Sequence, residues 1–231
     1  FEPLLVTGNN LYCKVDLFMK PNENTERLHD MTQLIKRMSA FLLCLMLLMG
    51  AFSSTALAAP DWPSGVSVQA ESGIVIDADT GTVLWGQNIH NQYFPASITK
   101  IMTALIVIET CSLDETVTFS HNAVFNVEAG SSNAGINEGD KLSVKDCLYA
   151  LLLKSANEAA NALAEHVAGS TEAFADMMNA KAKELGCTDT HFANPSGLND
   201  PEHYTSTYDM ALIARAAFLN PTFEEIDSTT Y

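Results

Sequence analysis

The chain has 231 residues, of which 47% are hydrophobic and 17% charged, and its 28 acidic residues outnumber the 12 basic ones. This hydrophobic share excludes a disordered chain, and no stretch reaches the ~20 apolar residues of a spanning helix, which excludes a polytopic membrane protein. The net charge of −16 would repel phosphate backbones, so it argues against nucleic acid as a partner. A globular domain, alone or with a tail, remains.

Residues 1–30 begin with Phe rather than Met and show no sustained hydrophobic period. We interpret them as an upstream extension that has no fold of its own. On this interpretation, translation starts at Met31 or Met38.

Residues 31–58 have the pattern of a secretory signal peptide. Lys36 and Arg37 precede an apolar run over 40–52, and Ala56-Leu57-Ala58 supplies small side chains at alternating positions. The run is too short to span a membrane comfortably, and it lacks the polar positions that a core helix would show at a 3.6-residue period. We therefore expect cleavage after Ala58 and export to the cell wall or periplasm.

The mature chain is predicted to open with a β-hairpin, because extended segments at 73–77 and 82–85 flank a turn that ends in Gly81. Apolar residues then recur at helical spacing from Ile98 to about Glu109. Residues 120–140 are rich in Asn, Ser and Gly, which predicts a long surface loop of the kind that often lines a site.

Further helices are expected from their start and stop signals. Ser143-x-x-Asp146 and Ser206-x-x-Asp209 have the spacing of helix N-termini, while Gly169 and Gly186 have the place of stops. An irregular stretch over 191–203 separates the last two helices. The expected helices cover 147–153, 158–167, about 172–185 and about 207–219.

Cysteine usage gives little support to a disulfide framework or a metal site. Cys13 and Cys44 fall before the predicted cleavage point, which leaves Cys111, Cys147 and Cys187. Three is an odd number and no C-x-x-C occurs, so unpaired core cysteines are expected, with their redox state left open.

Ser97-x-x-Lys100 is the strongest candidate for chemistry. Residues three apart share a helix face, so the Lys100 amine can accept the proton of the Ser97 hydroxyl if burial lowers the lysine pKa. Free N–H groups at a helix start also favour developing negative charge. Alone, the motif is weak, because an N-cap serine followed by a solvated lysine gives the same pattern.

Ser155-Ala156-Asn157 is a second candidate, at a turn between two apolar helices. A hydroxyl there can relay a proton while the amide holds a substrate carbonyl, although simple helix capping is the alternative. Ser131-Ser132-Asn133 offers the same spacing, but it lies in the predicted loop. Preorganised groups are expected between packed helices, which favours Ser155.

These segments, in their order along the chain, resemble a known family. Pro95-Ala-Ser-Ile-Thr-Lys100 follows the hairpin, Ser155-Ala-Asn-Glu-Ala-Ala160 comes next, and His191-Phe-x-Asn-Pro-x-Gly-Leu198 leads to His203-Tyr-Thr-Ser-Thr-Tyr-Asp-Met210. Together they are similar to the serine-type D-alanyl-D-alanine carboxypeptidases of peptidase family S11, the low-molecular-mass penicillin-binding proteins. The resemblance covers about residues 68–231.

The resemblance implies a mixed α/β fold, with an antiparallel sheet flanked by helices, and an enzyme without cofactor or metal. Ser97 would attack the carbonyl between the last two D-alanines of a peptidoglycan stem peptide, with Lys100 as its base. Ser155 would pass the proton to the leaving D-alanine, and Asn157 would hold the peptide. The Ser97 N–H would form half of the oxyanion hole, and β-lactams would acylate Ser97.

The sequence departs from the family at its third motif, because no Lys-Thr-Gly occurs in the 231 residues. In the family, that strand supplies the second oxyanion N–H and a cation for the substrate carboxylate. We therefore expect residues 59–231 to be the N-terminal part of the catalytic domain, with the C-terminal strands missing. On this expectation the full-length parent is active and this stretch alone is inactive.

Two other functions stay open at this stage. A serine β-lactamase uses the same Ser-x-x-Lys logic, although no carboxylate dedicated to deacylation can be identified, and a non-catalytic penicillin-recognising sensor or scaffold would need no third motif. His191, His203 and Asp200 are weak metal candidates, because their loop has no regular ligand spacing. Peripheral membrane association through a C-terminal segment, the preferred stem peptide and the oligomeric state are also left open.

Overall fold

The computed structural model describes residues 31–42 and 68–230. The chain forms two compact units, 1–60 and 61–231. In the first unit, residues 31–42 form a helix with exposed side chains. The rest of the predicted signal peptide, with its cleavage point, lies outside the described residues, and so do residues 1–30. Within the described ranges, no helix combines the length and the apolar character that crossing a membrane requires.

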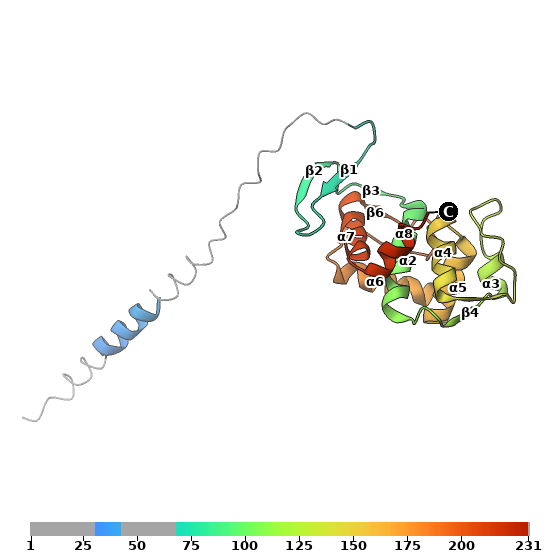
Figure 1. Cartoon of the computed structure of the whole chain (residues 1–231). Coiled ribbons are helices and arrows are strands. Elements are labelled where there is room, and N and C mark those ends of the chain that lie inside the picture. The colour runs from blue at the N-terminus through green and yellow to red at the C-terminus, as the bar shows by residue number, and fades with distance from the viewer. Residues whose placement is uncertain (1–30, 43–67, 231) are drawn as a thin grey trace, which may run out of the picture. The chain divides into compact units, whose positions relative to one another are not determined.

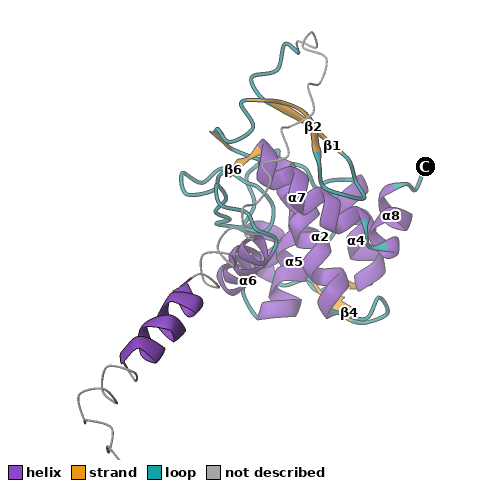
Figure 2. Cartoon of the chain, turned by 90° about the vertical axis from the view of Figure 1, so that its left-hand side faces the viewer, coloured by secondary structure: helices purple, strands orange, loops and turns teal. Residues whose placement is uncertain are grey.

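The second unit is built around helix α5, Asn157–Ala168, which packs against α2, α3, α4 and α6. Its first eight residues, from Asn157 to Ala164, are all buried, and several are alanines that let neighbouring helices approach closely. Figure 2 shows the helices forming the bulk of the unit. The other helices are η1 (Ala96–Thr99, a 3₁₀ helix), α2 (Lys100–Thr110), α3 (His121–Phe125), α4 (Val144–Leu153), α6 (Thr171–Glu184), α7 (Thr207–Phe218) and α8 (Pro221–Asp227).

The described strands form three two-stranded antiparallel sheets, β1–β2, β3–β6 and β4–β5. The first confirms the predicted hairpin, which lies beside α7 (Figure 1). Arg215 of α7 holds the hairpin turn, because its Nε and Nη2 donate to the carbonyl oxygens of Ala78 and Asp79, both at 2.7 Å. The strands are β1 (Gly73–Ile76), β2 (Val83–Gln87), β3 (Gln92–Tyr93), β4 (Thr116–Thr118), β5 (Lys141–Ser143) and β6 (Thr205–Ser206).

The predicted helices are confirmed, and two short ones were missed. The predicted loop over 120–140 contains α3, which begins where the Ser120 hydroxyl accepts from the N–H of Ala123. Helix α8 follows the expected end of α7, because the Asn220 side chain caps it and Pro221 occupies its first turn. The expected Asn-Pro stop is therefore also the start of another helix.

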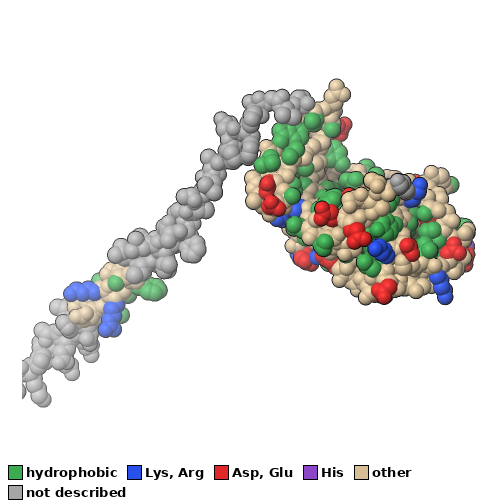
Figure 3. Space-filling view, viewed as in Figure 1, with side chains coloured by type: hydrophobic (Ala, Val, Ile, Leu, Met, Phe, Trp, Pro, Cys, Tyr) green, Lys and Arg blue, Asp and Glu red, His purple; other side chains and the backbone are tan. Residues whose placement is uncertain are grey.

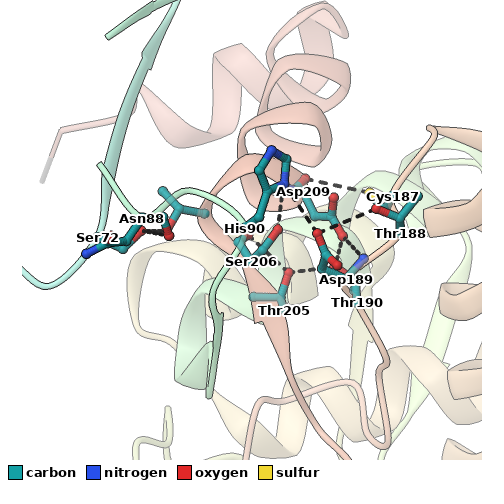
Figure 4. Close-up of polar contacts among 11 residues, drawn as sticks. Ser72, Asn88, His90, Cys187, Thr188, Asp189, Thr190, Thr205, Ser206 and Asp209 are labelled. Carbon is teal, nitrogen blue, oxygen red and sulfur yellow. Dashed lines mark hydrogen bonds and ion pairs between the residues drawn. The ribbon is translucent and has the colours of Figure 1, made fainter. Parts of the chain in front are cut away.

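A polar network fastens the start of α7 to the segment before the irregular stretch (Figure 4). The hydroxyl of Ser206 caps α7 by accepting from the N–H of Asp209. The fully buried Asp209 carboxylate accepts from the Asp189 N–H and from the Thr190 hydroxyl, each at 2.7 Å. His90 reaches Asp189 from the loop after β2, at 3.4 Å. These bonds fix one end of the segment that leads to the candidate site.

Candidate active site

Ser97 and Lys100 lie on a tight turn and not within one α-helix. Ala96 takes a left-handed backbone conformation, with φ of 51°, and η1 then carries Ser97 directly to the start of α2 at Lys100. The Ser97 residue is exposed, whereas Lys100 is only 2% exposed. The Lys100 Nζ donates to the Ser97 Oγ at 3.5 Å, so the predicted pair does meet.

Two oxygen atoms hold the Lys100 amine beside the serine. The Nζ donates to the Asn157 side-chain Oδ1 at 2.7 Å and to the Ser196 carbonyl oxygen at 2.6 Å. Burial lowers the pKa of Lys100 to about 8, while the negative charge of Glu158 acts in the opposite direction. The structure thus places a lysine that is partly neutral near pH 7 against an exposed hydroxyl.

Ser155 lies between α4 and α5 in a left-handed conformation, with φ of 54°. Its hydroxyl oxygen is buried and has no hydrogen-bond partner within the described residues. An unpaired buried hydroxyl is costly, but the Ser131 hydroxyl oxygen of the rival segment is buried and unpaired as well, so this feature alone does not distinguish Ser155. Ser155 and Asn157 thus flank the start of α5, and the Asn157 amide reaches Lys100 directly.

The rival Ser131-Ser132-Asn133 segment lies against this motif. The Ser132 carbonyl oxygen accepts from the Asn157 N–H at 3.0 Å. The buried Glu158 carboxylate then accepts from three consecutive backbone N–H groups, at 2.6, 3.1 and 3.5 Å. The donors are Ala134, Gly135 and Ile136. The sequence analysis did not predict a role for Glu158, although this residue directly follows the Ser-Ala-Asn motif.

The irregular stretch over 191–203 supplies contacts that the sequence did not predict. Gly197 has φ of 82°, and a Cβ there would lie 1.9 Å from the Ala96 carbonyl oxygen, so only glycine fits against the turn that carries Ser97. Thr103 donates to the Pro195 carbonyl oxygen at 2.7 Å. The glycine of the Asn-Pro-x-Gly pattern was the sequence feature that could have indicated this close approach of two backbone segments.

His203 ties the same stretch to the start of α2. Its Nδ1 accepts from the Ala193 N–H at 3.0 Å, which leaves the proton on Nε2, and Nε2 lies 2.8 Å from the Thr99 hydroxyl. Burial lowers the pKa of His203 to about 4, with Asp200 raising it and His191 lowering it. Both ring nitrogens are therefore used by protein groups, which removes His203 from the weakly supported metal set.

A small cavity of about 110 Å³ opens beside this contact. A larger cavity of about 490 Å³ lies elsewhere, between α3 and the start of α6. On the face seen in Figure 3, acidic side chains are dispersed over the second unit and form no single patch. The small cavity is lined by Phe94, Ala96, Gly197, Leu198, Asn199, Asp200 and His203.

The chain is similar to known proteins over most of its length. The chain is 38% identical over 185 residues to the D-alanyl-D-alanine carboxypeptidase DacF of Bacillus subtilis, covering 77% of this chain and 46% of that protein. Its fold is similar to the crystal structure of the D-alanyl-D-alanine carboxypeptidase DacD from Francisella tularensis, with a TM-score of 0.67 and 37% identity. The match covers 71% of this chain and 41% of that one.

A second solved structure, penicillin binding protein 6B from Escherichia coli, matches with a TM-score of 0.68 and 35% identity, covering 72% of this chain and 56% of that one. The chain spans about half the length of the curated relatives it matches. The family model for D-alanyl-D-alanine carboxypeptidases, Peptidase_S11, matches residues 55–230. The chain therefore belongs to the D-alanyl-D-alanine carboxypeptidase family.

Proposed function

We propose that the protein is a serine D-alanyl-D-alanine carboxypeptidase that removes the terminal D-alanine from peptidoglycan stem peptides through an acyl-enzyme on Ser97. The observation that carries the proposal is the buried Lys100 amine, hydrogen-bonded to the exposed Ser97 hydroxyl and fixed by Asn157 and Ser196. Family membership supports the same activity.

In the first step, the neutral Lys100 amine takes the proton of the Ser97 hydroxyl. The Ser97 oxygen attacks the carbonyl carbon between the last two D-alanines, and the backbone N–H of Ser97 donates to the developing oxyanion. The C–N bond then breaks, and the leaving D-alanine amine takes up a proton. Water hydrolyses the resulting ester and regenerates the serine.

Ser155 and Asn157 are proposed to serve the leaving group and the peptide. The Ser155 hydroxyl, which has no partner within the described residues, passes the proton from Lys100 to the leaving amine. Lys100 occupies the Oδ1 of Asn157, so the Nδ2 is the group proposed to donate to a substrate carbonyl. No described residue is assigned to the substrate carboxylate.

The test uses a labelled penicillin and a D-Ala-D-Ala peptide with the full-length protein and its Ser97→Ala variant. We expect a stable adduct on Ser97 together with D-alanine release, both lost in the variant. Rapid hydrolysis of the drug would favour a β-lactamase, and an adduct without D-alanine release would favour a sensor or scaffold. Labelling that persists in Ser97→Ala would overturn the assignment of the nucleophile.

Export is part of the same proposal, because a stem-peptide hydrolase must meet its substrate outside the cytoplasm. Its support is the signal-peptide pattern of residues 31–58. Mass spectrometry of the exported protein should find a new N-terminus at Ala59, and an unprocessed N-terminus would contradict the proposal. Attachment to the membrane by a C-terminal segment stays a prediction, which cell fractionation tests.

A further inference from the structure

A second group of reactive side chains lies at the opposite end of α2 from Lys100. Cys111 directly follows α2, Glu115 precedes β4, and His166 belongs to the last turn of α5. The Cys111 Sγ, a Glu115 carboxylate oxygen and a His166 ring nitrogen all lie within 4.8 Å of one another. Since α2 has 11 residues, about 16 Å of helix separates this group from Lys100.

The backbone that carries these side chains is fixed on both sides. The Cys111 N–H donates to the Val107 carbonyl oxygen at 2.9 Å, which closes α2. The Glu115 carbonyl oxygen accepts from the Val144 N–H at 2.9 Å, at the start of α4. Helix α5 ends just beyond His166, at the left-handed Gly169. The three side chains are thus presented by backbone that is held by hydrogen bonds to residues outside the cluster.

The Glu115 carboxylate is already oriented in the way that a metal ligand requires. Its Oε1 accepts from the Ser112 N–H at 2.6 Å, while its Oε2 lies 3.0 Å from the His166 Nε2. Ligand carboxylates at metal sites are held by additional hydrogen bonds such as the one from Ser112, whereas the contact between Oε2 and Nε2 joins two proposed ligand atoms and would be replaced by the ion. The bond to Ser112 occupies Oε1 and leaves Oε2 as the oxygen that faces His166.

We propose that Cys111, Glu115 and His166 bind a divalent transition-metal ion, with Zn²⁺ as the best-fitting ion and water as the fourth ligand. Thiolate, imidazole and carboxylate are the ligand types that Zn²⁺ takes, at about 2.3 Å for sulfur and 2.0–2.2 Å for nitrogen and oxygen. Tetrahedral bonds of these lengths set the ligand atoms about 3.5 Å apart, so the imidazole and carboxylate are already close enough.

On binding, the separation to the thiol has to shorten, and the hydrogen bond between the His166 Nε2 and the Glu115 Oε2 has to open. The side chains of His166 and Glu115 are 24% and 43% exposed, so they have room to turn and solvent can deliver the ion. Binding releases the Cys111 proton to water, and the proton between the His166 Nε2 and the Glu115 carboxylate leaves so that Nε2 can coordinate, with the neutral imidazole keeping its proton on Nδ1. The site then has one thiolate, one carboxylate and one neutral imidazole. The ion would then clamp the end of α2 to the end of α5, the central helix, independently of the proposed hydrolase activity.

The test is titration of the metal-free full chain with Co²⁺, which replaces Zn²⁺ and gives a thiolate-to-metal absorption band. We expect one Co²⁺ per chain, displaced by Zn²⁺, and a rise in the unfolding temperature with Zn²⁺. The changes Cys111→Ser and His166→Gln should each remove the band or weaken binding by at least about tenfold.

Two matched controls separate the site from adventitious binding. Cys187→Ser removes another partly buried thiol and His121→Gln breaks another histidine–glutamate pair, and neither should change the titration. Circular dichroism in chelator reports whether each variant is folded, and the exposed Glu115→Gln serves if Cys111→Ser is not. The absence of a band, or a band and an affinity that His166→Gln leaves unchanged, would overturn the proposal, since a lone thiol would then explain any binding.

Discussion

At the scale of single residues, the electrostatics of Lys100 decide whether the proposed chemistry is available near neutral pH. With a pKa of about 8, roughly a tenth of the lysine is neutral at pH 7, compared with a negligible fraction at the usual value of 10.5. Burial provides this shift, and hydrogen-bond acceptors on two sides keep the amine beside Ser97. The fold therefore both holds the Lys100 amine in place and lowers its pKa.

The rate of acylation should consequently depend on pH. Because the neutral amine is the base, the second-order rate constant for penicillin labelling should rise about tenfold per unit below pH 8 and level off above it. Labelling measured between pH 6 and 9.5 checks this expectation. Lys100→Arg, which stays protonated, should be inactive throughout, and a flat profile in the wild type would contradict the role of Lys100 as base.

Glu158 should shift that profile, because its charge raises the pKa of Lys100. In Glu158→Gln the midpoint should move below pH 8. The loss of charge-assisted hydrogen bonds to residues 134–136 should also lower the free energy of unfolding by about 1–3 kcal/mol. The exposed Glu184→Gln is the control. A midpoint that stays in place would show that Glu158 acts on the loop alone.

At the scale of elements, the site depends on the irregular stretch over 191–203 lying directly on η1 and α2. Lys100, Thr103 and Thr99 each bond to it, through Ser196, Pro195 and His203. These bonds join segments about a hundred residues apart in sequence. A stretch without regular structure therefore fixes the turn that carries the proposed nucleophile.

Gly197→Ala tests this dependence. The added Cβ would meet the Ala96 carbonyl oxygen at 1.9 Å, so the backbone on one side has to move. We expect acylation to fall by at least about a hundredfold, since a 1 Å misplacement of reacting groups has a cost of that order. Gly186→Ala is a matched control, because Gly186 also has positive φ, at 87°, but its Cβ would meet nothing within 4 Å.

Both variants should lose some stability from the strained backbone, by about 1–2 kcal/mol. Only Gly197→Ala should lose acylation beyond what its folded fraction explains, as measured by labelling and circular dichroism on the same samples. Equal acylation in the two variants would mean that the contact with Ala96 does not position Ser97.

At the scale of the whole molecule, the second unit should lose stability in mild acid through His203. The folded pKa of about 4 lies below the usual 6.5, so the unfolded chain binds the proton first. The contribution of neutral His203 is complete above pH 6.5 and is lost as the pH falls toward 4. Unfolding by denaturant at several pH values should show the free energy of unfolding falling over this range. The fall should be smaller in His203→Gln.

His121→Gln is the matched control for this prediction, because the side chain of His121 is 69% exposed. Between pH 6.5 and 4, the stability of His121→Gln should fall by as much as that of the wild type. If His203→Gln also followed the wild type, the acid sensitivity would have to come from other groups.

Most of the helical framework could be predicted from the sequence, because it depends on local signals. Apolar spacing, Ser143 and Ser206 as caps, and Gly169 and Gly186 as stops each act within a few residues of where they stand. The short helices α3 and α8 were missed because their caps occur in segments that otherwise have the composition of a loop.

The candidate site was only partly predictable for the same reason. Ser97 and Lys100 are three residues apart, so their meeting follows from local geometry, and Asn157 was placed by its motif. The contacts of Ser196, Gly197 and His203 join distant segments, which no local period reveals. Glu158 was overlooked because its partners are backbone N–H groups, which no sequence pattern marks.

Two non-glycine residues of the candidate site, Ala96 and Ser155, have left-handed backbones. Glycine would relieve the steric cost at both positions, but it would have opposite consequences for a cell that depends on the enzyme. At position 96 only a methyl group is removed, whereas at position 155 the hydroxyl disappears with it. A population of randomly mutated genes under selection should therefore keep glycine at the first position and eliminate it at the second.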